Sequence, residues 1–139
     1  MDLREHFEND RLAQALGIEL IDVAPGRARA RMKIEERHYN SARTAHGGAI
    51  FTLADFVFTA ASNSYGTIAL SINASISYVK AVRSGWIEAE AVEESFGPRV
   101  GAYRVRIRDE AGDVVAIFQG QVYRKRDTID SVYETKSEE

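Results

Sequence analysis

The sequence predicts an α+β fold in which one antiparallel β-sheet wraps around a single long α-helix. The helix is predicted over Ala49 to Ala61, because this stretch is apolar or small except at Thr52, Asp55 and Thr59 and contains no Pro or Gly. Segments with the alternation of apolar and polar residues that is typical of strands precede and follow it. The chain has no second helix of equal apolar character, so the sheet must bury this one.

Before the helix, the chain is predicted to form a helical segment and a β-hairpin. Residues 2–16 carry an approximate apolar stripe that Asn9-Asp10 divides into two short pieces. Ile18 to Val23 and Arg27 to Ile34 are predicted strands, joined by a turn that contains Pro and Gly. In the second strand apolar residues alternate with Arg and Lys, which predicts a buried face and a solvated basic face rather than a site for an acidic ligand.

After the helix, four more strands are predicted. Thr67 to Val79 is the longest, and its length places it at the centre of the sheet. Its apolar face is expected to carry Ile68, Leu70, Ile72, Ile76 and Tyr78, and its polar face Ser71, Asn73, Ser75 and Ser77. The remaining strands are Gly85 to Glu94, Val100 to Arg108 and Val114 to Arg124, with a hairpin turn between the last two.

These elements indicate one domain over residues 1–124. Residues 125–139 are charged and lack a core pattern, so we expect them to form a mobile C-terminal tail. A chain of 139 residues with 45% apolar and 28% charged residues has the length and composition of one globular domain.

Composition and charge exclude several classes of function. The net charge is -3 and the 18 Lys and Arg residues are dispersed, which argues against nucleic acid as a partner. Cysteine is absent and His6, His38 and His46 are not at the spacing of metal ligands, so we expect neither a disulfide nor a metal site. The N-terminus is charged and no apolar run approaches ~18 residues, so we expect no signal peptide, no membrane span and a cytoplasmic location.

One row of polar residues follows the predicted helix. Gly48, Thr52, Asp55, Thr59 and Ser62 are spaced by four, three, four and three residues, so they form a polar seam along one side of it. An unpaired carboxylate in a core costs free energy, so Asp55 needs hydrogen-bond partners or a role that uses a perturbed pKa. A structural aspartate and a functional one are both open interpretations.

The start of the predicted helix has the features of a second part of a functional site. His46-Gly47-Gly48 places unpaired backbone N–H groups at the positive end of the helix dipole, where they can receive a polarised carbonyl or an oxyanion. The two glycines leave no side chain in the way of a ligand. His46 and Asp55 are nine residues apart, roughly 13 Å along a helix axis. We therefore predict that two antiparallel copies of the helix, from two protomers, share each site.

The residues around this helix resemble a known family. The positions that carry the resemblance are Asn40, His46-Gly47-Gly48, Phe51, Leu53-Ala54-Asp55, Asn63-Ser64, Gly66 and Ala116-Ile117-Phe118-Gln119-Gly120. With them, the chain from about Ile18 to Arg124 resembles the hotdog-fold acyl-CoA thioesterases of the phenylacetate-pathway, or PaaI-type, group. The spacing between the histidine and the aspartate is the most specific part of the match.

This resemblance implies a hotdog fold that dimerises through the sheet, with the long strand after the helix pairing with its copy. It implies an enzyme that hydrolyses a medium-chain or aromatic, phenylacetyl-type acyl-CoA to free acid and CoA without metal or cofactor. A homotetramer built as a dimer of dimers is expected from relatives. The main alternative is a non-catalytic acyl-CoA-binding protein of the same fold. A hotdog enoyl-CoA hydratase is a weaker one, because no Asp and His are spaced for acid–base work on one loop and helix.

The resemblance also assigns roles to residues. Asp55 is expected either to attack the thioester carbonyl or to activate a water, and the sequence does not separate these routes. Backbone N–H groups at Gly48 and its neighbour are expected to polarise the carbonyl. The other residues expected to position or bind substrate are Asn40, His46, Gly47, Ser71, Phe51 and Thr59. An apolar acyl pocket is expected to be lined by Phe51, Phe56, Phe58 and Tyr78.

Two positions depart from the family pattern. Many relatives carry glycine three residues after the asparagine, where this chain has Arg43, and an aspartate is frequent where Trp86 follows Gly85. Neither change touches the expected reacting groups. Both bear on the conformation of a loop and on contacts to the distal part of a substrate.

Overall fold

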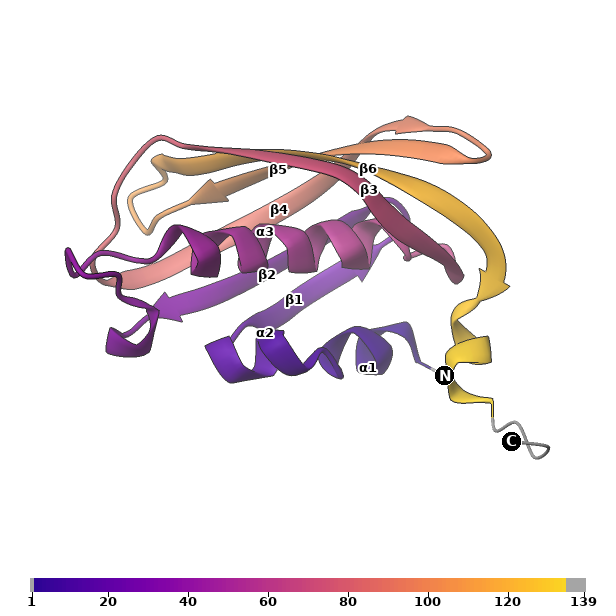
Figure 1. The fold of residues 1–139 in the computed structure, drawn as a ribbon, viewed down its shortest axis with the longest axis horizontal. Helices are drawn as coiled ribbons and strands as arrows, with labels where there is room; N and C mark the ends of the chain where they lie inside the picture. Colours follow the sequence, from indigo (N-terminus) through magenta and orange to yellow (C-terminus); the bar gives the residue numbers. More distant parts are fainter. Residues whose placement is uncertain (1, 135–139) are drawn as a thin grey trace.

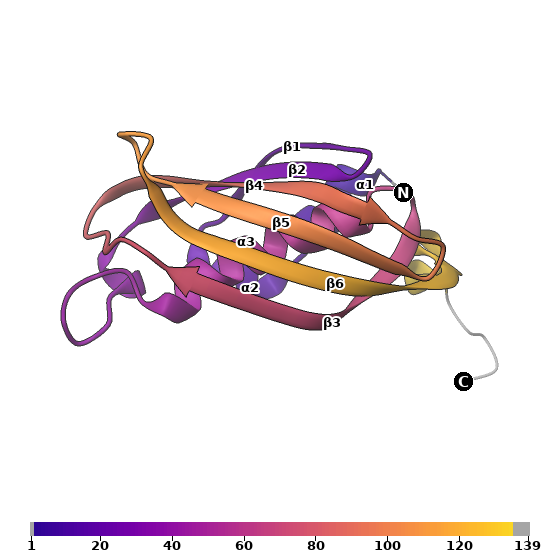
Figure 2. The ribbon, with the colours of Figure 1, turned by 90° about the horizontal axis from the view of Figure 1, so that it is seen from above.

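A computed structural model describes residues 2–134 and shows a six-stranded antiparallel sheet curved around one long helix (Figure 1). The elements in chain order are α1 (Leu3–Glu8), α2 (Arg11–Leu16), β1 (Glu19–Ala24), β2 (Arg27–Ile34), η1 (Glu36–His38), α3 (Gly47–Ser62), β3 (Thr67–Tyr78), β4 (Gly85–Phe96), β5 (Val100–Arg108), β6 (Val114–Thr128) and η2 (Ile129–Tyr133). The strand order across the sheet is β1-β2-β4-β5-β6-β3 (Figure 2). The predicted α+β architecture is confirmed.

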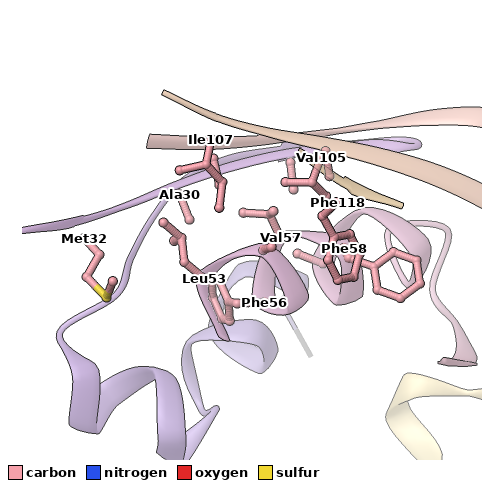
Figure 3. Close-up of a cluster of buried hydrophobic side chains, with 14 of the residues drawn as sticks. Ala30, Met32, Leu53, Phe56, Val57, Phe58, Val105, Ile107 and Phe118 are labelled. Atoms are coloured by element: carbon pink, nitrogen blue, oxygen red, sulfur yellow. The ribbon is translucent and has the colours of Figure 1, made fainter. Parts of the chain in front are cut away.

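The core lies between α3 and the concave face of the sheet. Leu53, Val57 and Phe58 of the helix are buried against the strands (Figure 3). Their neighbours in the cluster are Ala30, Val105, Ile107 and Phe118. Gly120 of β6 lets the helix come close, because a Cβ at this position would lie 2.6 Å from the Phe58 ring. The helix is therefore held firmly on its sheet side.

The hairpin β1–β2 has the two faces that the sequence predicts. Ala28, Ala30, Met32 and Ile34 are buried. The basic residues of the outer face pair with acids of the neighbouring strands. Arg29 bonds Asp22 at 2.7 Å and Glu88 at 3.0 Å, and Arg31 bonds Glu19 at 3.0 Å. These arginines are occupied within the sheet, in agreement with a solvated strand face.

β3 does not lie at the centre of the sheet, as its length predicted, but at an edge, and among residues 2–134 it pairs with β6 alone. A bulge between Ser71 and Asn73 also splits the predicted faces. Ser71 is opposite the buried Val122 and therefore points to the helix side, whereas Asn73 is opposite Gln121 on the outer side. The sequence pattern missed both features, because strand order and bulges depend on partner strands.

The two short helices α1 and α2 cover a second side of α3 (Figure 1). The predicted interruption at Asn9-Asp10 is confirmed, and the Asp10 side chain caps α2 by accepting a hydrogen bond from the Ala13 N–H at 3.0 Å. His38 fixes this layer to the loop before α3. Its Nε2 lies 2.8 Å from the Leu16 carbonyl, and its Nδ1 accepts a hydrogen bond from the Glu35 N–H at 2.9 Å.

The structure corrects the start of the expected C-terminal tail. β6 continues past Arg124 to Thr128 and leads into η2, whose Ile129 is only 2% exposed. The Ile129 N–H donates to the Gly66 carbonyl at 2.9 Å, and Tyr133 lies beside the first helix with its Oη 2.5 Å from Nδ1 of His6. The last five positions of the expected tail, residues 135–139, lie outside the described residues. Within the described residues no helix is long and apolar enough to span a membrane.

Candidate active site

Helix α3 begins with a histidine cap followed by two glycines. His46 is the N-cap, and its Nδ1 accepts a hydrogen bond from the Gly48 N–H at 2.8 Å. The Gly48 N–H predicted to polarise a carbonyl is thus engaged in this structure. The adjacent Gly47 N–H has no acceptor among residues 2–134. Gly47 is therefore the open donor at the positive end of the helix.

Tyr78, at the end of β3, holds this helix start in place. Its hydroxyl donates to the Gly47 carbonyl at 2.8 Å. The ring lies close to the same residue, because a Cβ at position 47 would come within 3.1 Å of the Tyr78 ring carbon and oxygen. Tyr78 was predicted as a pocket residue, and the structure shows it as a clamp on the helix N-terminus.

Asn40 organises the loop that leads to the helix. Its Oδ1 accepts from the N–H groups of Ala42 and Thr44 at 3.0 and 3.1 Å, and its Nδ2 donates to the Thr44 hydroxyl at 3.0 Å. Arg43 in this loop has a φ of 61°, in the left-handed region that favours glycine. This is the position where relatives were expected to carry glycine. Arg43 therefore holds a backbone conformation that glycine adopts at a lower cost in free energy.

The polar seam of α3 leaves one acid without a partner. Thr52 donates back to the Gly48 carbonyl at 2.8 Å, and Ser62 to the Thr59 carbonyl at 3.2 Å. Asp55 is half-buried, and no hydrogen-bond or ion-pair partner for its carboxylate lies within residues 2–134. Burial raises the pKa of Asp55 above its ordinary value, and the negative charge of Asp10 raises it further.

A single protomer does not bring the two halves of the site together. Gly47 and Asp55 are on one straight helix, eight residues or about 12 Å apart. Ser71 lies on the helix side of the exposed edge strand, and Thr59 is exposed one turn beyond Asp55.

Of the aromatic residues predicted for the acyl pocket, Phe58 lies in the core and Phe51 lies at its border. Phe58 packs on Phe118 with ring centroids 5.4 Å apart and is 1% exposed. Phe51 is partly buried with its ring 5.5 Å from Phe118. Phe58 therefore supports the helix against the sheet, whereas the partly exposed Phe51, four residues before Asp55, stays a predicted substrate-binding residue. The sequence alone missed this because an apolar helix gives little sign of which face meets a ligand.

Asp10 is a residue of this region that no sequence pattern selects. It is distant in sequence from Asp55, and only the packing of α2 on α3 brings its charge close enough to act on that carboxylate. Among the described residues no three His, Asp or Glu side chains converge as metal ligands do.

Comparisons with known proteins identify the family of this chain. A family model described as the thioesterase superfamily matches residues 42–116. The acyl-coenzyme A thioesterase PaaI of Escherichia coli is 33% identical over 124 residues, covering 88% of this chain and 89% of that protein.

Two solved structures show the same fold. The structure of the E. coli PaaI protein from the phenylacetic acid degradation operon has a TM-score of 0.86 and 31% identity, covering 89% of this chain and 91% of that one. A mutant structure of the phenylacetic acid degradation protein PaaI from Thermus thermophilus has a TM-score of 0.80 and 35% identity, covering 84% of this chain and 100% of that one. This chain therefore belongs to the thioesterase superfamily, in the PaaI-type group of hotdog-fold thioester hydrolases.

Proposed function

We propose that this thioester hydrolase cleaves a medium-chain or aromatic acyl-CoA into the free acid and CoA, with Asp55 as the reacting carboxylate. The observation that carries the proposal is the state of Asp55, which is half-buried and has a raised pKa but no partner to neutralise it within the described chain. A structural aspartate in such a place would be hydrogen-bonded. An acid that reacts must instead keep its oxygens open to substrate.

The helix start supplies the second half of the reaction. The Gly47 N–H, aided by the helix dipole, donates to the thioester oxygen and stabilises the charge that forms there. As a general base, Asp55 takes a proton from water while the water oxygen bonds to the carbonyl carbon. The carbon–sulfur bond then breaks, and the CoA thiolate leaves and takes up a proton. As a nucleophile, Asp55 bonds to the carbonyl carbon, the carbon–sulfur bond breaks and the CoA thiolate leaves and takes up a proton. The acyl anhydride that remains on Asp55 is hydrolysed by water in a second step, which releases the free acid and restores the carboxylate.

A dimer completes each site in this proposal. β3 is a 12-residue edge strand without a single charged residue, and Leu70 and Ile72 on it are 52% and 57% exposed. Such an edge favours pairing with another strand. Pairing of two β3 strands about a two-fold axis sets the two α3 helices antiparallel, so Gly47 of one protomer comes level with Asp55 of its partner. Two such dimers form the proposed homotetramer, and the CoA substrate suits a cytoplasmic enzyme.

The first test uses mixed oligomers of two inactive variants. Asp55→Asn removes the reacting carboxylate, and Gly47→Pro removes the donor while proline suits the first position of a helix. Each is expected to lose about 10²-fold in kcat. Gly47→Ala is the matched control, because it adds the same Cβ near Tyr78 but keeps the N–H.

Refolding the two variants together in equal amounts should restore activity. Half of the dimers then pair one variant with the other, and one of their two sites is intact, so roughly a quarter of wild-type activity is expected. No recovery in oligomers shown by mass to be mixed would contradict a shared site. An Asp55→Asn protein with normal turnover would remove Asp55 from the reaction.

The second test is a panel of acyl-CoA substrates, assayed with and without a chelator. We expect the highest kcat/KM for a medium-chain or aromatic acyl group and no effect of chelation. A preference for acetyl-CoA would contradict the proposed substrate class. Binding of acyl-CoA without any turnover would favour the non-catalytic alternative. If the active enzyme sediments as a monomer, the proposed dimer is contradicted. If it sediments as a dimer, the proposed tetramer is contradicted.

A further inference from the structure

A cavity of about 260 Å³ lies where α1 and η2 meet α3. Phe7 and Phe56, both buried, give it an apolar floor. Thr59 of the polar seam lines it on the helix side, one turn from Asp55. The cavity thus reaches the polar seam one turn past Asp55, on the side away from the helix start.

The outer wall of this cavity is made by the C-terminal turn. Tyr133 of η2 lines it, with its Oη 2.5 Å from Nδ1 of His6 and the two rings edge to face at 5.5 Å. In Figure 1, η2 lies near the N-terminal end of α1, in agreement with the contact between Tyr133 and His6. The wall therefore consists of the two ends of the described chain, where the Tyr133 hydroxyl contacts His6 and accepts a hydrogen bond from Nδ2 of Asn9 at 3.4 Å.

We infer that this cavity receives the far end of a neutral acyl chain and that Tyr133 sets how long that chain can be. The inference rests on the proposed function and names the part of the substrate that decides specificity. A cavity of about 150 Å³ can hold benzene, so 260 Å³ has room for a ring or a chain of about six carbons. The apolar floor gains free energy by covering such a group.

The charges near the cavity select against an acidic chain. Asp10 lines the rim and Asp55 lies one turn from Thr59, while the described lining residues include no Lys or Arg. His6 also lines the cavity, but burial lowers the pKa of its imidazole and so favours the neutral ring. A carboxylate at the far end of the acyl group would therefore be placed near a negative charge without a permanent cation to pair with it. Acyl groups that end in a methyl or a ring fit, and dicarboxylic acyl groups do not.

Tyr133→Ala tests the wall. The wild type and this variant are compared by kcat/KM on hexanoyl-CoA and decanoyl-CoA. Removing the ring should raise the decanoyl-to-hexanoyl ratio by about 10-fold or more, since each methylene in a fitted pocket counts strongly. Tyr133→Phe keeps the ring and should keep the ratio within about 3-fold. Val132→Ala, on the same turn but outside the cavity lining, should leave it unchanged.

Asp10→Asn tests the charge with a second pair of substrates, adipyl-CoA and hexanoyl-CoA, which differ only by the terminal carboxylate. The wild type should hydrolyse adipyl-CoA poorly, and the variant should raise the adipyl-to-hexanoyl ratio by about 5-fold. Asn caps a helix as well as Asp does, so the fold is kept.

The outcomes separate the cavity from the reaction. Suppose that the wild type hydrolyses hexanoyl-CoA and that the decanoyl-to-hexanoyl ratio of kcat/KM in Tyr133→Ala stays within about 2-fold of the wild-type ratio. This result overturns the cavity inference and leaves the proposed function standing. Equal rates on adipyl-CoA and hexanoyl-CoA in the wild type overturn the neutral-chain inference. No hydrolysis of any acyl-CoA by the wild type removes the proposed function, and this inference with it.

Discussion

Asp55 on helix α3 and Glu93 on the neighbouring strand β4 are both half-buried acids, but their surroundings differ. Glu93 lies near the C-terminal end of the helix, where it accepts from the hydroxyls of Tyr103 at 2.6 Å and Tyr65 at 3.0 Å and pairs with Arg124 at 3.4 Å. Asp55, in the middle of the helix, has no such partner within the described residues and has Asp10 as a negative neighbour. The same chemical group is fully satisfied in one place and open in the other.

The difference shows which end of α3 is built for stability. Arg124 is 7% exposed and bonds the Ser62 carbonyl at 3.1 Å and the Gly97 carbonyl at 3.2 Å, so it joins the last turn of the helix to the sheet. Burial raises the pKa of Tyr103, and its hydrogen bond to Glu93 adds to the rise. In this network the hydroxyls of Tyr65 and Tyr103 therefore stay protonated and donate to the Glu93 carboxylate. The Asp55 region instead accepts a cost that only a ligand or a partner protomer can offset.

Asp55→Asn should give the largest effect and should separate activity from stability. We expect kcat to fall about 10²-fold or more while the protein stays folded. Because burial raises the folded-state pKa of Asp55, this group favours folding below its unfolded pKa and loses that contribution as the pH rises through the folded pKa. At pH 7 the neutral amide should therefore raise the free energy of unfolding, by at most about 1 kcal/mol because solvent screens a half-buried group. A loss of stability in urea unfolding would contradict this account.

Glu93→Gln should show the reverse pattern. Removing this carboxylate leaves Arg124 buried without its anion, and we expect the free energy of unfolding to fall by about 2–3 kcal/mol. The kcat of the folded fraction should stay close to that of the wild type. Urea unfolding and active-site titration measure the two quantities.

Glu94→Gln is the matched control for Glu93→Gln. It removes an exposed pair with Arg104 and should cost less than about 0.5 kcal/mol. Equal losses in the two variants would show that the Glu93 network carries no special weight.

Asp10→Asn should sharpen the electrostatic side of the comparison. The negative charge of Asp10 raises the pKa of Asp55, so removing it lowers that pKa. The rise of kcat/KM with pH, which follows ionisation of Asp55, should then begin at lower pH. A pH profile of the variant measures the shift, and Asp22→Asn, whose carboxylate pairs with Arg29, should leave the profile in place. A profile that moves to higher pH would contradict the sign.

Arg43→Gly should have the smallest effect. A φ of 61° costs free energy for any residue with a Cβ, so glycine should stabilise the loop by less than about 1 kcal/mol after the entropy gained by the unfolded chain is counted. Ala42→Gly in the same loop only increases the entropy of the unfolded chain, so it should lower the free energy of unfolding. Thermal unfolding of the two variants compares them, and a lower Tm for Arg43→Gly would show that the arginine side chain makes a contact of value.

The sequence by itself determined the long helix, the alternation of the strands, the seam with Asp55 and the Gly pair at the helix start, because period and spacing are local properties. It also predicted the distance along the helix that keeps His46, at the helix start, from meeting Asp55 within one protomer. Only the tertiary structure decided that β3 is an edge, that Phe58 faces Gly120 instead of a substrate, that His46 occupies the Gly48 N–H, and that η2 closes a cavity against α1. Each of these depends on which distant segment packs alongside, and side-chain periodicity along one segment carries no information about its neighbour.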